Sequence, residues 1–232
     1  GGCYVAPAAA TKPLNQDGNA FIQGGYRGAA PSNSLKDADF SKHFSSRGIN
    51  GTGQVVAVMD SGLSISHCMF EGNDAADEFD TVVPIPFSLA FNVSGSLNNS
   101  TRKVAGLIYD ELTNGDVLSS GSSNDEHGTH VAATVAGQRV TGAISSGDGV
   151  APGARIHFCD VQNEQMDFIP PEPLSDPFSI AYSAGARIHT NSWGEADVTM
   201  LGSYTSHCLQ ADALVHQNPD STLIFAAGHT GH

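Results

Sequence analysis

The chain has 232 residues, which is enough for one substantial hydrophobic core, and we expect one domain over residues 34–232 after an extension over 1–33. Its formal net charge of −14 would repel nucleic acid and an anionic membrane surface, so neither is expected as a partner. No apolar run approaches the roughly 18 residues of a membrane span, and we expect a soluble monomer without membrane contact.

The N-terminal part of the domain begins with a helix and a strand. A short helix is expected over residues 35–47, with Ser34 as its N-cap and Gly48 at its end. Residues 55–60, V-V-A-V-M-D, are a continuous apolar run closed by Asp60. Strands that are buried on both faces need such a run, so we expect a buried parallel strand here.

The following stretch is irregular until a helix begins near residue 125. Residues 64–123 show no sustained period, although 103–109 favour a strand and the two prolines within 82–91 favour an edge strand or an extended loop. The run 124–137, N-D-E-H-G-T-H-V-A-A-T-V-A-G, joins capping residues to small apolar residues spaced by three and four. It predicts a buried helix, whose inward rows are Val131, Ala132, Val135 and Ala136.

Strands and helices alternate with short links in the second half of the chain. Strands are expected over 155–161, 186–191 and 221–227, and helices over 177–185 and 199–217. The apolar face of the longer helix is formed by Leu201, Tyr204, Cys208, Ala211 and Val215. This alternation predicts right-handed crossovers and an α/β fold with a mainly parallel sheet that helices cover on both faces.

The candidate site joins the strand end at Asp60 to the helix that contains His127. Asp60 stands at the carboxyl end of its strand, and the catalytic groups of open α/β sheets collect at that edge. His127 falls in the first turn of the buried helix, at the rim of whatever that helix packs against. Asp60 is therefore where a carboxylate that orients the imidazole would sit.

Five short motifs resemble those of the subtilisin-like serine peptidases. V-A-V-M-D-S-G at 56–62 and H-G-T-H-V-A at 127–132 match the aspartate and histidine motifs of this family. Three later stretches agree in order and spacing: G-V-A-P-G-A at 149–154, H-T-N-S-W-G at 189–194 and L-I-F-A-A-G at 223–228. The forms of the motifs look most like the branch that includes the oxidation-resistant alkaline proteases and the transporter-fused proteases of social amoebae. The resemblance implies a three-layer αβα fold that is incomplete at its C-terminus.

The resemblance also implies roles for named residues. His127 would be the general base and then the general acid, and Asp60 would accept a hydrogen bond from its other ring nitrogen. Ser192, Trp193 and Gly194 would line a cleft in which an extended peptide pairs through main-chain hydrogen bonds. The substrate would be a peptide or a protein, and catalysis would need neither a cofactor nor a metal.

Two departures from the family pattern bear on activity. The family carries an asparagine that helps to hold the oxyanion after the A-A-G strand end, whereas this chain has His229. The family nucleophile lies in a G-T-S-M-A motif, and neither G-T-S-x-A nor G-x-S-x-G occurs in residues 1–232. We therefore expect the chain alone to be inactive, either as the N-terminal portion of an active endopeptidase domain or as part of a pseudoprotease that binds peptide without cleaving it. Because relatives continue with a long buried helix, we also expect a large exposed apolar patch.

Other interpretations exist for the histidines and for Ser61. His127 and His130 together with Glu126 could bind zinc, but the helical H-E-x-x-H spacing is absent and no third ligand is evident. His130 is interpreted as structural. Ser61 could be a nucleophile beside Asp60, but the family match makes it a turn residue.

The remaining features concern cysteines, glycosylation and location. The four cysteines, which allow either two disulfides in three connectivities or free buried thiols, are Cys3, Cys68, Cys159 and Cys208. The N-glycosylation sequons are at Asn50, Asn92, Asn98 and Asn99. Together with the start at Gly1 and the lack of a complete signal peptide, they favour a mature or truncated extracellular product, or one on the lumenal side of an endomembrane compartment. The acidic side chains could form structural calcium sites.

Overall fold

The computed structural model describes residues 44, 47–65, 67–70, 83–84, 102–109, 126–140, 147–162, 168–195, 197 and 199–228. The extension expected over 1–33 lies outside these residues, as does nearly all of the helix expected over 35–47. None of the helices in the described part of the chain has the length and apolarity needed to cross a membrane.

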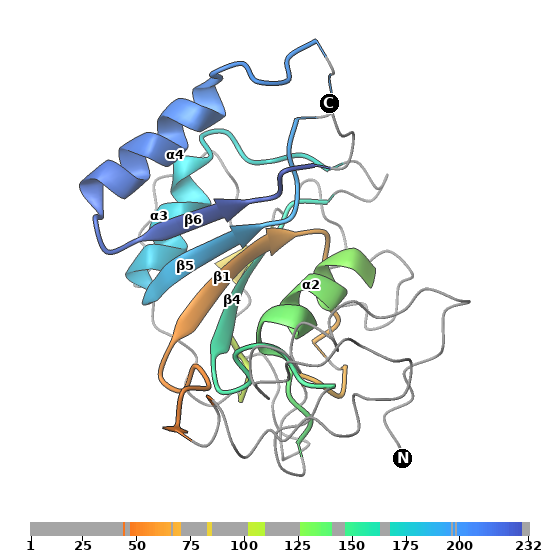
Figure 1. The fold of residues 1–232 in the computed structure, drawn as a ribbon. Coiled ribbons are helices and arrows are strands. Elements are labelled where there is room, and N and C mark those ends of the chain that lie inside the picture. Colours follow the sequence, from red (N-terminus) through yellow and green to blue (C-terminus); the bar gives the residue numbers. More distant parts are fainter. Residues whose placement is uncertain are drawn as a thin grey trace, which may run out of the picture.

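Six strands form one sheet in the order β2-β3-β4-β1-β5-β6 (Figure 1). The strands are β1 (Val55–Asp60), β2 (Val83–Pro84), β3 (Val104–Tyr109), β4 (Arg155–Asp160), β5 (Ala186–Asn191) and β6 (Thr222–Phe225). The helices in the described residues are α2 (Glu126–Ala136), α3 (Ser175–Ser183) and α4 (Ser206–Gln217). All strand pairs of the sheet are parallel, which confirms the predicted α/β fold with a mainly parallel sheet.

β1 lies in the middle of the sheet and is covered on both faces. Successive side chains of a strand point to opposite faces, so such a strand needs apolar residues at consecutive positions. Val56 and Val58 pack with Phe158 in the core on the α2 side. Met59 packs with Phe178 in the core on the side of α3 and α4. Figure 1 shows α2 on one face and α3 and α4 on the other, which gives the three layers.

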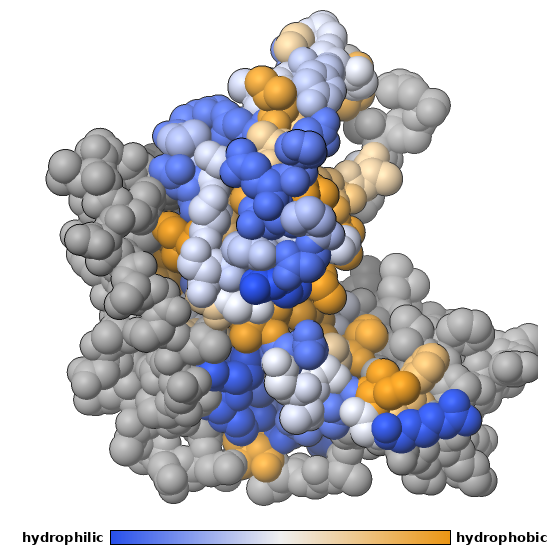
Figure 2. Space-filling model, turned by 90° about the vertical axis from the view of Figure 1, so that its left-hand side faces the viewer, coloured by the Kyte–Doolittle hydropathy of each residue, from blue (hydrophilic) through white to orange (hydrophobic). Residues whose placement is uncertain are grey.

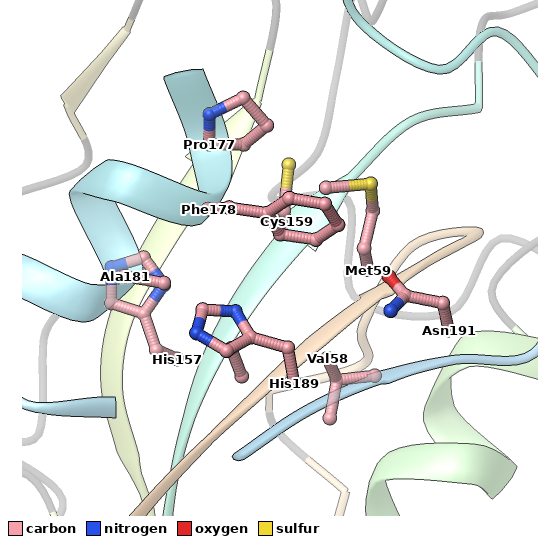
Figure 3. A pocket seen from close by; sticks show the side chains of 10 residues that line it. Val58, Met59, His157, Cys159, Pro177, Phe178, Ala181, His189 and Asn191 are labelled. Atoms are coloured by element: carbon pink, nitrogen blue, oxygen red, sulfur yellow. The ribbon is translucent and has the colours of Figure 1, made fainter. Parts of the chain in front are cut away.

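The face of the sheet toward α3 buries two histidines. His157 of β4 and His189 of β5 are both in register with Ala57 of β1, which lies between them. Their rings line one small cavity beside Phe178 of α3 (Figure 3), and the rings of Phe178 and His189 meet edge-on with centroids 5.3 Å apart. Burial lowers the pKa of each imidazole to about 4, so both rings are neutral at neutral pH.

The longer C-terminal helix starts later than the sequence predicts. α4 begins at Ser206 and not at residue 199. The Asp197 carboxylate accepts hydrogen bonds from both the amide and the hydroxyl of Thr199, at 2.8 and 2.7 Å. Gly202 has φ +78°, which lies outside the helical region. A turn therefore occupies the segment between Thr199 and the helix.

The apolar face predicted for this helix is only partly buried. Leu201 and Tyr204 precede α4 and are exposed, whereas the buried residue of α4 is Leu214. On the neighbouring edge strand β6, Ile224 is 50% and Phe225 is 40% exposed. Figure 2 views the molecule from the side of α4 and β6 and shows hydrophobic residues at the surface. The described residues of β6 thus include exposed apolar side chains, and the large apolar patch expected from the sequence stays a prediction.

The cysteines combine the two predicted patterns, a disulfide and a free buried thiol. Cys68 is disulfide-bonded, whereas Cys159 and Cys208 are free thiols, so two disulfides do not form. Burial in the core raises the pKa of Cys159. A hydrogen bond with Thr205 lowers the pKa of Cys208, which is near the surface.

Candidate active site

The end of β1 places Asp60 inside the protein. Its side chain is 1% exposed. Oδ1 accepts a hydrogen bond from the Ser61 amide at 2.8 Å and a second from the Ser61 hydroxyl at 3.3 Å. Oδ2 is buried and has no hydrogen-bond partner among the described residues. The carboxylate is therefore held through one of its two oxygens.

α2 brings His127 to that same oxygen. Nδ1 of the imidazole lies 2.7 Å from Oδ1 of Asp60. A carboxylate can only accept, so Nδ1 donates and Nε2 keeps the lone pair of the neutral ring. The His127 side chain is 63% exposed, so the ring can meet a substrate while its partner stays in the interior. The two residues paired by the sequence therefore meet in the fold, and their catalytic roles stay a prediction.

Gly128 allows the close approach of α2 to the end of β1. A Cβ atom at this position would overlap the carbonyl oxygens of Ser61 and Gly62. The Gly128 amide donates to the Ser61 hydroxyl oxygen at 3.3 Å, and the Ser64 amide donates to the Thr129 hydroxyl oxygen at 2.8 Å. The first turn of α2 is thus attached directly to the turn that follows β1. Ser61 belongs to this turn.

A second buried carboxylate stands beside Asp60 on the neighbouring strand. Asp160 is in register with Asp60 at the ends of β4 and β1, and it is 6% exposed. Its Oδ1 accepts hydrogen bonds from the amides of Gly62 and Gln162, both at 3.0 Å. Asp160 is not among the residues that the sequence motifs single out. Its place at a strand end, like that of Asp60, is the signal that could have found it.

The predicted cleft residues come directly after β5. Ser192 and Trp193 are partly buried, and Gly194 is exposed. The Trp193 indole donates through Nε1 to the main-chain carbonyl of Met59 at 3.1 Å. The segment is therefore attached to β1 at the residue that precedes Asp60.

An open groove of about 1110 Å³ lies next to this segment. Trp193 forms part of its wall, and the ring packs against Phe168 and Phe225 at centroid distances of 5.6 and 5.3 Å. α4 and β6 supply further apolar lining, including Val215 and Leu223. A substrate-binding role for Ser192, Trp193 and Gly194 stays a prediction.

The oxyanion position and a metal site are the two remaining features considered from the sequence. His229, at the position of the oxyanion-binding asparagine, lies outside the described residues. Within the described ranges, no group of three or more His, Cys, Asp or Glu side chains is arranged to hold a metal ion. His130 is exposed on α2.

The amino-acid sequence is similar to those of known proteins. The family model of the subtilase family matches residues 51–231. The serine protease/ABC transporter B family proteins tagD and tagB of Dictyostelium discoideum are 34% and 33% identical to the chain over 186 and 185 residues. Each match covers 78% of this chain but only 9% and 8% of the relatives, so the chain spans less than a tenth of their length.

Structural comparison agrees at the level of the fold. The Clostridium perfringens CspB protease has a TM-score of 0.50 and 15% sequence identity, over 80% of this chain and 38% of that chain. This likeness shows the common fold. Because the family model spans most of the sequence and includes both Asp60 and His127, the chain belongs to the subtilase family.

Proposed function

We propose that the chain supplies the Asp–His part of a serine endopeptidase, in which Asp60 and His127 act together on a serine outside residues 1–232. The observation that carries this proposal is the 2.7 Å contact between His127 Nδ1 and Asp60 Oδ1. Membership of the subtilase family supports it, as does the likeness to relatives named serine proteases.

His127 carries the proton through the reaction. Nε2 takes the proton of the serine hydroxyl as the serine oxygen attacks the scissile carbonyl. The ring becomes an imidazolium, which Asp60 stabilises through the Nδ1 hydrogen bond without taking up the proton. His127 then gives the proton to the leaving amine, and an acyl-enzyme remains. Water activated by the same base hydrolyses the acyl-enzyme.

A peptide or protein substrate would bind as an extended strand along Ser192, Trp193 and Gly194. Backbone pairing would give affinity, and side-chain pockets would give selectivity. A saturating peptide inhibitor should slow amide hydrogen exchange at residues 190–195, and unchanged exchange would contradict this placement. The reaction needs no cofactor. Structural calcium and an extracellular or lumenal location are further parts of the proposal.

A pseudoprotease is the second candidate, and His229 favours it. Loss of one oxyanion donor typically costs about 3 to 4 kcal/mol in the transition state. An imidazole N–H can also donate to an oxyanion, but its reach and charge differ from those of an asparagine amide. A domain of this kind would keep the cleft and bind peptide without cleaving it.

Labelling with a fluorophosphonate probe separates the two candidates, because the probe reacts with a serine that its base activates. The full-length protein that contains residues 1–232 should be labelled, and the substitution His127→Ala should abolish the labelling. The control Asp220→Asn should keep it, because Asp220 is an exposed carboxylate bonded to Tyr182 and Arg187.

Residues 1–232 alone should not be labelled. Labelling of this chain would contradict the placement of the nucleophile outside it. A folded full-length protein that is not labelled would overturn the peptidase proposal and favour the pseudoprotease.

A further inference from the structure

Asp60 depends on its backbone for its orientation. One oxygen of the carboxylate carries the described hydrogen bonds from Ser61 and His127, and the other has no partner among the described residues. A small shift of the chain on either side of Asp60 would therefore lengthen the 2.7 Å contact with His127. The main-chain pairing of β1 ends at this point, so other groups must fix the chain.

On the β4 side, a side chain continues the pairing beyond the last strand residue. The ladder between β1 and β4 ends at the Asp60–Asp160 pair, and the Val161 amide donates to the Asp60 carbonyl at 3.1 Å. Past this bond, the Asp160 carboxylate accepts the Gly62 amide at 3.0 Å. Because the Gln162 amide donates to the same oxygen at 3.0 Å, the carboxylate is itself fixed to its own strand end.

On the β5 side, the Trp193 indole holds the chain beyond the end of the strand pairing. The ladder between β1 and β5 ends at the Met59–Asn191 pair. The Trp193 indole then donates to the Met59 carbonyl at 3.1 Å. Phe168 and Phe225 pack against the indole ring and fix its orientation. The chain is thus held one residue before Asp60 from β5 and two residues after it from β4.

We propose that Asp160 and Trp193 are positioning residues for the Asp60–His127 pair, because they hold the backbone on the two sides of Asp60. Neither residue touches His127 in a described contact, and both act through the turn that carries Asp60. The two hydrogen bonds join residues that are 98 and 134 positions apart in the sequence, so they report the assembled sheet. The importance of this arrangement for catalysis rests on the proposed function, but its geometric effect can be measured without a nucleophile.

The tautomer of His127 is the readout, and the 232-residue chain is the sample. In the unaltered chain, the ¹⁵N shifts of the His127 ring should show mainly the Nδ1–H tautomer, because Asp60 accepts that proton. The resonances are assigned by their loss in His127→Ala. A change in overall stability alone would not move this tautomer ratio in the molecules that remain folded.

Three variants test the two supports. Asp160→Ala removes the acceptor of the Gly62 amide, and Trp193→Phe removes the indole donor but keeps an aromatic ring. Each should lower the ratio of the Nδ1–H to the Nε2–H tautomer about fivefold, the effect expected for the loss of one hydrogen bond. Asp160→Asn keeps an acceptor oxygen and should stay within about twofold of the unaltered chain. Asp220→Asn is the control, and it should leave the ratio unchanged.

Each result decides the proposal. Unchanged ratios in folded Asp160→Ala and Trp193→Phe would overturn it, and a drop in Asp160→Asn as large as in Asp160→Ala would also contradict it. If Asp160→Ala fails to fold, Trp193→Phe and Asp160→Asn decide by the same criteria. If the unaltered chain lacks the Nδ1–H tautomer at His127, the proposed function fails first, which separates the two failures.

Discussion

Lowering the pH from 7 to 5 should destabilise the folded chain through the buried His157 and His189. Burial is the main cause that lowers the pKa of each ring from 6.5 to about 4. The neighbouring His189 further lowers the pKa of His157, and Arg187 further lowers the pKa of His189. The residues that line the cavity beside the two rings include no carboxylate that could pair with a charged imidazole. The folded state therefore resists protonation.

The sign and size of the effect follow from proton linkage. With the pKa of each ring lowered to about 4 in the folded state, the unfolded chain binds more protons than the folded chain between pH 6.5 and pH 4. Stability is thus intact above pH 6.5 and falls as the pH drops through this window. Between pH 7 and pH 5, each histidine should cost about 2 kcal/mol, or about 4 kcal/mol for the pair.

Urea unfolding followed by the fluorescence of Trp193, the single tryptophan, measures this loss. The variant His189→Leu removes one titrating ring and should reduce the loss between pH 7 and pH 5 by about half. His216→Leu is the control, because His216 is exposed in the last turn of α4. An equal pH dependence in His189→Leu and the unaltered chain would refute the reasoning.

Two further predictions concern a glycine and the thiols. Gly128→Ala should lower the free energy of unfolding by about 2 kcal/mol or more, because its Cβ would overlap the backbone after β1. Gly194→Ala is the control, because the new Cβ has open space around it and should change the free energy of unfolding little. Equal urea midpoints for the two variants would contradict this prediction. A thiol reagent should modify Cys208 in the folded chain and spare Cys159, because the pKa of Cys208 is lowered near the surface and that of Cys159 is raised by burial. Modification that persists at the same rate in Cys208→Ser would show that the reasoning is wrong.

The elements around the site could be predicted because their local pattern agrees with their place in the fold. The run at 55–60 is apolar from Val55 to Met59 and ends in Asp60, and β1 occupies the same residues, buried on both faces. The helix expected over 124–137 forms over Glu126–Ala136. Small residues spaced by three and four fit a helix that packs closely against a sheet, so pattern and burial coincide here.

The start of α4 could not be predicted from the same kind of pattern. Apolar residues continue with helical spacing through Leu201 and Tyr204, but the Asp197 side chain closes a turn and Gly202 takes a positive φ. Side-chain hydrogen bonds to the backbone compete with helix formation at such positions. The spacing of apolar residues carries no information about these hydrogen bonds, so it could not predict where the helix begins.

The supports of Asp60 depend on the order of the strands. Asp160 and Trp193 reach the backbone around Asp60 because β4 and β5 are the two neighbours of β1 in the sheet. No local pattern encodes which strands become neighbours or where their ladders end. The sequence motifs could therefore find Asp60 and His127, while these contacts required the assembled fold.

The central claim is that Asp60 and His127 act as one unit in peptide-bond hydrolysis, and a double-mutant cycle on the full-length protein tests it most directly. Asp60→Asn should lower the turnover of a peptide substrate about 10⁴-fold, the cost found when this carboxylate is lost from a serine-protease triad. The effects of substitutions within such a unit are strongly non-additive, so the double variant Asp60→Asn/His127→Ala should be about as slow as His127→Ala alone. Turnover of Asp60→Asn within about tenfold of the unaltered protein, or full additivity of the two substitutions, would contradict the account.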